Sequence, residues 1–213
     1  MTSWKFAAAI LAAVFLAAGP ASATDWSDGT SPWLFRLRGL AVVPNASANV
    51  DQIPGANAAI DNSYVPELDI NYFWNANIST ELILGVTPHH VTGRGALNGV
   101  DIGRAWLLPP TLTLKYHVTE FGAFRPYVGA GVNYTMFLDE RAAGGTINTI
   151  NIHDTFGAAL QAGFDYMFDK NWGFNIDVKR LFLRPVVDYN GGSLTGRLTI
   201  DPWLVGAGVV YRF

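Results

Sequence analysis

Eight stretches of the chain alternate between apolar and polar residues with a period of two. They span residues 33–43, 64–75, 78–87, 105–118, 124–138, 154–168, 172–184 and 203–213. A period of two puts alternate side chains on opposite faces of a β-strand, so the pattern predicts eight strands and an all-β fold. In the last stretch one row carries no charge and has an aromatic residue at each end, from Trp203 to Phe213. Such a row is typical of a strand that crosses a bilayer with its rings at the two interfaces.

The connections between these stretches alternate between long and short. Residues 44–63, 88–104, 139–153 and 185–202 are predicted to form long loops, whereas residues 75–77, 119–123 and 169–171 are predicted to form turns. An even number of strands, short periplasmic turns and longer external loops are the pattern of outer-membrane barrels. We therefore predict an eight-stranded antiparallel transmembrane β-barrel with both termini on the periplasmic side.

The first 23 residues have the features of a secretory signal peptide. Lys5 precedes an apolar run over residues 6–18, and Ala21, Ser22 and Ala23 form an A-x-A cleavage site. The apolar run is shorter than the roughly 20 residues that a transmembrane helix needs. We therefore predict cleavage after Ala23, export through the periplasm to the outer membrane of a Gram-negative cell, and a single barrel domain over residues 24–213.

Composition narrows the possible functions. The chain has no Cys, only 15% charged residues, a net charge of −3 and no basic run. Disulfides, redox chemistry and nucleic-acid binding are therefore not indicated. No long apolar run follows residue 23, so no transmembrane helix is expected. A closed barrel is the other structure that satisfies every backbone group in lipid.

Charged residues fall on the rows that face the lumen. An arginine that faced lipid would be costly, whereas one that faces a lumen is ordinary. Opposite charges in a narrow lumen should pair, because each is costly alone. We predict a charged plug of four basic and four acidic side chains: Arg36, Arg38, Asp69, Glu81, Lys115, Asp165, Asp177 and Lys179.

Other inward positions are apolar and fall mostly toward the external end of the barrel. They are Leu40, Val42, Val65, Leu107, Phe137, Leu181, Leu183 and Leu204. We interpret them as an apolar vestibule above the plug, although such residues also fill space in barrels without any transport role.

Pro109 and Pro110 interrupt a strand, because proline cannot donate a ladder hydrogen bond. They mark a possible lateral exit from the vestibule into lipid.

Several motifs together resemble the OmpW family of outer-membrane proteins. They are Leu108-Pro-Pro-Thr-Leu-Thr-Leu-Lys-Tyr116, Pro126-Tyr-Val-Gly-Ala-Gly-Val-Asn-Tyr134, Gln161-Ala-Gly-Phe-Asp-Tyr166, Asp201-Pro-Trp203 and Gly208-Val-Val-Tyr-Arg-Phe213. The resemblance implies an eight-stranded barrel with an apolar channel for small hydrophobic molecules.

Tyr211 and Phe213 also resemble the carboxy-terminal assembly signal of outer-membrane barrels. The expected partners are outer-membrane lipid, small apolar solutes and the barrel assembly machinery. The sequence indicates no cofactor and no oligomeric state.

Other classes of protein remain as alternatives. A soluble lipocalin-type barrel would crowd the large apolar rows into its lumen. A lipid-modifying enzyme would need a base and a nucleophile, and His117 with Thr111 or Thr113 is the nearest set, with no inward Ser. His89, His90 and His153 lack the spacing of a metal site. A structural or adhesive barrel would act through its external loops.

Overall fold

The computed structural model describes residues 31–145 and 147–213, so the predicted signal peptide lies outside the described residues. It contains fifteen strands and one short 3₁₀ helix, η1 (Asn190–Gly192). The strands are β1 (Trp33–Val43), β2 (Ser47–Val50), β3 (Ala56–Ile60), β4 (Ser63–Phe73), β5 (Ile78–Leu84), β6 (Thr87–Gly95), β7 (Asp101–Leu108), β8 (Thr111–His117), β9 (Phe124–Ala142), β10 (Ile150–Ile152), β11 (Thr155–Met167), β12 (Trp172–Phe182), β13 (Val186–Tyr189), β14 (Leu194–Thr199) and β15 (Trp203–Arg212).

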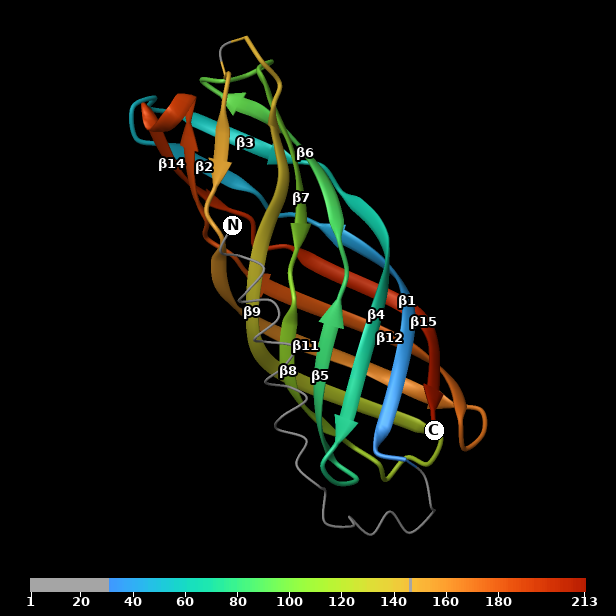
Figure 1. Cartoon of the computed structure of the whole chain (residues 1–213). Coiled ribbons are helices and arrows are strands. Elements are labelled where there is room, and N and C mark those ends of the chain that lie inside the picture. The colour runs from blue at the N-terminus through green and yellow to red at the C-terminus, as the bar shows by residue number, and fades with distance from the viewer. Residues whose placement is uncertain (1–30, 146) are drawn as a thin grey trace.

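Eight antiparallel strands close into a barrel, as the sequence predicts (Figure 1). The order around the wall is β1, β4, β5, β8, β9, β11, β12 and β15, and β15 pairs with β1 to complete the circle. The described ends of the chain lie together, because the Ser31 amide donates to the Phe213 carbonyl over 2.7 Å. We call this end, which also holds the short connections, the turn end, and the opposite end the loop end.

The four predicted long loops contain more strands than expected. β2 and β3 lie in residues 44–63, nearly all of β6 and the first half of β7 lie in residues 88–104, β10 lies in residues 139–153, and β13 and β14 lie in residues 185–202. β3, β6, β7 and β9 pair in series, and β10, β13, β14 and β2 form a separate four-stranded sheet. These strands continue the wall at the loop end (Figure 1). The sequence did not reveal them because segments such as β3 have small and polar residues and no marked alternation.

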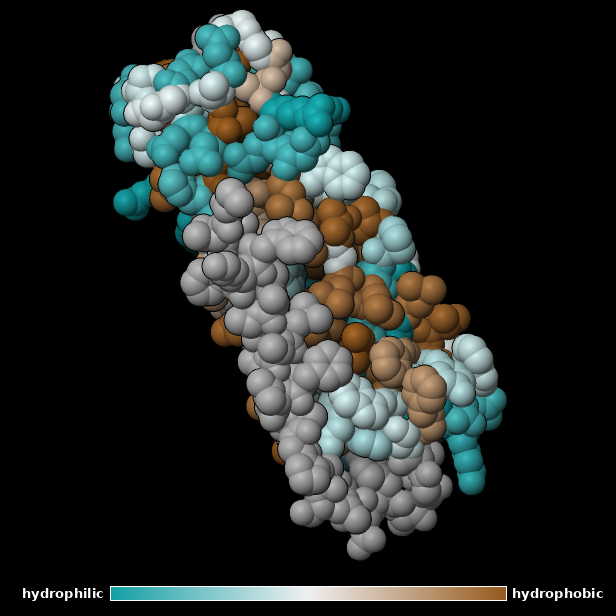
Figure 2. Space-filling view, in the orientation of Figure 1, coloured by the Kyte–Doolittle hydropathy of each residue, from teal (hydrophilic) through white to brown (hydrophobic). Residues whose placement is uncertain are grey.

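The outer surface has the banding of a membrane protein. Figure 2 shows hydrophobic side chains across the middle of the visible face and hydrophilic ones at the loop end. At the turn end, ring contacts 4.7–6.5 Å apart link Trp74, Tyr72, Trp33, Phe35, Phe213, Tyr211 and Trp172. From Trp203 to Phe213 a strand rises roughly 33 Å at about 3.3 Å per residue. With a tilt of roughly 40° this is about 25 Å along the axis, which matches the apolar band of such barrels.

In residues 31–145 and 147–213, no helix has the length and hydropathy needed to cross a membrane.

Candidate functional site

The structure places all eight predicted charged residues in one layer across the middle of the lumen. Each of them is at most 2% exposed. Arg36 contacts three carboxylates of the layer. Its guanidinium donates two parallel hydrogen bonds to Asp165, from Nε to Oδ1 over 2.8 Å and from Nη2 to Oδ2 over 2.7 Å. Its Nη1 lies 3.1 Å from Asp69 Oδ2 and 3.4 Å from Glu81 Oε2. Three strands besides β1 are therefore tied to one arginine.

The other three cations complete the network. Arg38 donates to Glu67 and to Asn175 Oδ1, and its Nη2 lies 3.0 Å from Asp69 Oδ2. Lys115 Nζ donates to Glu81 Oε2 over 2.6 Å, and Lys179 Nζ donates to Asp177 Oδ1 over 2.7 Å. Every cation thus has at least one carboxylate partner, which buried charges require.

The layer also contains side chains that were absent from the predicted plug, and four of them are Glu67, Tyr127, Gln161 and Asn175. Glu67 is 1% exposed and adds a fifth carboxylate to the four predicted. Tyr127 donates to Asp177 Oδ2 over 2.7 Å, and Lys115 Nζ lies 3.6 Å from the centre of its ring. Gln161 donates to Glu81 and Asp177, and Asn175 donates to Asp165. All four occupy inward positions of the alternating pattern, so the sequence places them in the lumen but does not show that they join the charged layer.

A glycine makes room for the Tyr127 ring. A Cβ atom at Gly163 would lie 2.6 Å from the Tyr127 hydroxyl oxygen and 2.5 Å from the Ile176 carbonyl oxygen. The aromatic side chain therefore fills the lumen only because β11 has no side chain at that position. The Tyr127 ring of β9 therefore packs against Gly163 of β11 inside the lumen, in addition to the hydrogen-bonded ladder between the two strands.

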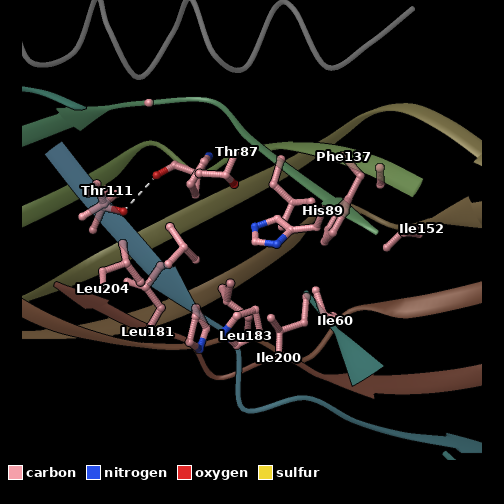
Figure 3. A pocket seen from close by; sticks show the side chains of 18 of the residues that line it. Ile60, Thr87, His89, Thr111, Phe137, Ile152, Leu181, Leu183, Ile200 and Leu204 are labelled. Carbon is pink, nitrogen blue, oxygen red and sulfur yellow. Dashed lines mark hydrogen bonds between the residues drawn. The ribbon is translucent and has the colours of Figure 1, made fainter. Parts of the chain in front are cut away.

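An apolar vestibule lies between the charged layer and the loop end (Figure 3). Seven of the eight residues predicted for it line this cavity: Leu40, Val42, Leu107, Phe137, Leu181, Leu183 and Leu204. The eighth, Val65, is partly buried against the same hydrophobic cluster. The cavity volume is about 50 Å³, which holds only a few water molecules. A larger solute therefore enters only as the lining side chains separate.

The lumen has a third layer that the sequence analysis missed. Leu34, Phe73, Met167 and Val210 form a small buried hydrophobic cluster at the turn end. The charged layer is therefore the middle of three layers rather than the whole inner half. This cluster closes the lumen below the charges with apolar side chains.

The barrel wall has a break in its hydrogen bonding beside the vestibule. The β5–β8 ladder ends at the pair Ile83–Thr111, and the β6–β7 ladder resumes at Thr87–Leu107. On the other side, the β4–β5 ladder ends at Leu68–Leu84. Within the described part of the chain, Gly85 and Val86 have no ladder partner on either side. Gly85 and Pro109 both line the vestibule, so the cavity reaches this break.

Pro109 and Pro110 form one edge of the same break, where the sequence predicts an interruption. On the side that faces β9, the two prolines are hydrogen-bonded. Asn133 Nδ2 donates to the carbonyl oxygens of Pro109 and Pro110, over 3.1 Å and 3.3 Å, and the Tyr134 amide donates to the Pro110 carbonyl oxygen. The interruption therefore faces Gly85 and Val86 and not β9.

The statement that no inward Ser accompanies His117 is wrong. Ser79 is fully buried, and its hydroxyl lies 2.8 Å from His117 Nε2. The imidazole packs between Phe73 and Tyr127, at centroid distances of 4.7 Å and 5.1 Å. The pair lies on the turn-end side of the charged layer and does not line the vestibule.

The three loop histidines are separate from one another in their contacts. His89 Nδ1 lies 2.9 Å from the Asp61 carbonyl oxygen, His90 Nε2 lies 2.9 Å from Asp101, and His153 Nε2 lies 2.8 Å from Asp188. The His153 contact helps to keep the pKa of the Asp188 carboxyl below its usual value. Among the residues that the structure describes, no three His, Cys, Asp or Glu side chains form a group that could hold a metal ion.

Comparison with known proteins identifies the family. The OmpW family model matches residues 31–213. An uncharacterized outer-membrane protein of Sinorhizobium fredii, y4mB, is 47% identical over 96% of this chain and 95% of its own length. The dibenzothiophene metabolism operon protein PahQ of Pseudomonas aeruginosa is 30% identical over 88% of this chain and 91% of its own.

The solved structures agree with this assignment. The crystal structure of the outer membrane protein OprG from Pseudomonas aeruginosa superposes with a TM-score of 0.78, at 28% identity, and the match covers 86% of this chain and 97% of OprG. The strand order, the outward apolar rows and the family match lead to the same conclusion. The chain belongs to the OmpW family and is an eight-stranded barrel of the outer membrane.

Proposed function

We propose that this barrel admits small apolar molecules into its vestibule and releases them sideways into the membrane. The observation that carries the proposal is what borders the vestibule. The charged layer lies beneath it, and backbone groups without ladder partners lie at its side. Its lining is almost wholly apolar, whereas the layer beneath it contains Arg36, Arg38, Lys115 and Lys179 with their carboxylates. An apolar solute gains nothing by displacing that network, because the separated charges would each be left unpaired.

The direction of passage follows from the orientation that we propose. With both termini periplasmic, the loop end faces the exterior and the vestibule opens toward the medium. The short turns and long connections support this orientation, since periplasmic turns are short in bacterial barrels. Solutes would then enter from outside and leave through the wall before reaching the charged layer.

The names of relatives support an apolar solute. PahQ is named for an operon of dibenzothiophene metabolism, and dibenzothiophene is an apolar tricyclic aromatic compound. PahQ and this chain align over most of both lengths. We therefore propose small aromatic or aliphatic hydrocarbons and their simple derivatives as the solute class.

The first test is to complete the hydrogen-bonded ladder. Replacing Pro109 with Val and Pro110 with Thr restores two backbone donors. Successive N–H groups of a strand point to opposite sides, and residue 110 faces β9, so the new donor at residue 109 is the one that faces Gly85 and Val86. One new ladder bond, at about 0.5–1.5 kcal/mol, should lower the open population about twofold to tenfold. Uptake of naphthalene into vesicles that contain the purified barrel should slow accordingly.

The control is Pro126→Val, which changes a proline of β9 near the turn end, away from the break. It should leave naphthalene uptake at the wild-type rate. Unchanged uptake in the Pro109/Pro110 variant would show that solutes do not leave at this break.

A further inference from the structure

One charged side chain of the plug also reaches the vestibule. Glu67, on β4, is 1% exposed and is the one acidic residue of the cavity lining. The other polar side chains of that lining are those of Thr87, His89 and Thr111. The Thr111 hydroxyl donates to the Pro109 carbonyl oxygen over 2.9 Å (Figure 3). The same hydroxyl accepts a hydrogen bond from Asn133 Nδ2. Glu67 is therefore the charged group that a solute at the bottom of the vestibule meets.

The two oxygens of this carboxylate have different surroundings. Oε1 accepts a hydrogen bond from Arg38 and lies 3.9 Å from Lys179 Nζ. Oε2 is buried and has no hydrogen-bond partner among the described residues. A buried carboxylate oxygen without a donor is costly, because it has lost its water and gained nothing in exchange. The geometry therefore leaves one strong acceptor where the charged layer meets the apolar cavity.

His89 supplies a second acceptor in the same cavity. Its Nδ1 lies 2.9 Å from the Asp61 carbonyl oxygen, and a carbonyl oxygen only accepts, so Nδ1 carries the proton. In the neutral ring, Nε2 is then an acceptor. Figure 3 shows the imidazole projecting into the cavity near Phe137 and Ile60. The vestibule thus offers a solute two hydrogen-bond acceptors, Glu67 Oε2 next to the charged layer and His89 Nε2 farther from it.

We propose that the vestibule selects apolar molecules that carry a hydroxyl group, which donates its hydrogen bond to Glu67 Oε2. This inference rests on the proposed function and names the class of solute: alcohols and phenols with an apolar body. A carboxylate head group would be repelled by Glu67. An ammonium group would lie beside Arg38 and Lys179, which already share this carboxylate. A neutral hydroxyl avoids both conflicts and keeps charge out of the apolar lining.

The test compares three solutes that differ at one substituent: 1-naphthol, 1-methoxynaphthalene and naphthalene. The hydroxyl of 1-naphthol donates, the ether oxygen only accepts, and naphthalene does neither. Binding is measured by calorimetry with the full barrel in lipid nanodiscs, and heats from empty nanodiscs are subtracted. We expect 1-naphthol to bind at least about tenfold more tightly than 1-methoxynaphthalene, as for a hydrogen bond to a charged acceptor.

The variant Glu67→Gln changes the chemistry but not the size of the group. Because Arg38 only donates, the amide oxygen takes the place of Oε1 and the amide nitrogen takes the place of Oε2. That nitrogen donates equally to a hydroxyl or an ether oxygen, so the tenfold preference should fall to about one. The control Asp139→Asn removes an exposed carboxylate that lies outside the charged layer and does not line the vestibule, and it should keep the preference.

The outcomes separate this inference from the function on which it rests. If the three solutes bind the wild-type barrel equally well, or if Glu67→Gln keeps the preference, the role of Glu67 is wrong and the apolar vestibule stands. If none of the three binds, the proposed function itself is wrong.

Discussion

Replacing Arg36 with Ala is expected to destabilise the barrel more than any other single change in the charged layer. Arg36 is fully buried, forms two hydrogen bonds with Asp165 and lies within 3.4 Å of Asp69 and Glu81. Its removal leaves these carboxylates facing one another with fewer cations. Breaking a buried ion pair on one side costs about 3–5 kcal/mol, because the remaining charge is left unpaired. Denaturant unfolding of the purified barrel in detergent, followed by tryptophan fluorescence, measures this loss.

The matched control is Arg184→Ala. Arg184 also pairs with a carboxylate, Asp201, over 3.0 Å, but its side chain is 61% exposed. Asp201 is only 11% exposed, but it also accepts a hydrogen bond from the Leu183 amide and so keeps a partner when Arg184 is removed. Because water already solvates the Arg184 side chain, the loss should be at most about 1 kcal/mol. Equal losses of unfolding free energy in the two variants would contradict the structural role assigned to the charged layer.

Cross-linking the wall beside Gly85 and Val86 should abolish release of apolar solutes. The chain contains no Cys, so introduced thiols are unique. Val86 is exposed and Leu108 is partly exposed, and continuing the Ile83–Thr111 register would place them opposite each other across the break. A short bifunctional thiosulfonate should join Cys side chains introduced by Val86→Cys and Leu108→Cys. Naphthalene uptake should fall at least about tenfold and recover after reduction, because the two strands can no longer separate.

A second pair of cysteines controls for the chemistry. Val178 and Val205 are register partners in the β12–β15 ladder and are 36% and 45% exposed. Cross-linking Val178→Cys to Val205→Cys spans two strands that are already hydrogen-bonded, so uptake should not change. If the link across the break leaves uptake intact, solutes take another route out of the barrel.

The alternation of side chains carried most of what could be predicted. Charged residues such as Arg36 and Lys179 must face inward in a strand that crosses lipid, so their row is readable from the sequence. Apolar rows likewise identify the membrane face. Strand count and wall order follow from these rows and from the short turns. The physical reason is that a charged side chain facing lipid costs free energy at each of these positions, so the two rows of a strand differ clearly in composition.

Partner choice within the lumen could not be predicted in the same way. Arg36 pairs with Asp165, which lies 129 positions away, and their meeting depends on the stagger of the closed barrel. Tyr127 was missed because its place in the charged layer depends on the space left by Gly163 on another strand. β2 and β3 were missed because strands outside the bilayer are under no pressure to alternate. Their stability comes from pairing, which a single segment does not show.

Apolar solutes should stop above the charged layer and leave through the wall. The most direct measurement is a crystal structure of the barrel soaked with 1-bromonaphthalene, in which anomalous scattering locates the bromine. Peaks are expected in the vestibule near Leu183 and Leu204, and at the outer side of the break near Val86. A peak in the turn-end cluster, among Leu34, Phe73 and Met167, would show passage through the charged layer and contradict release through the wall.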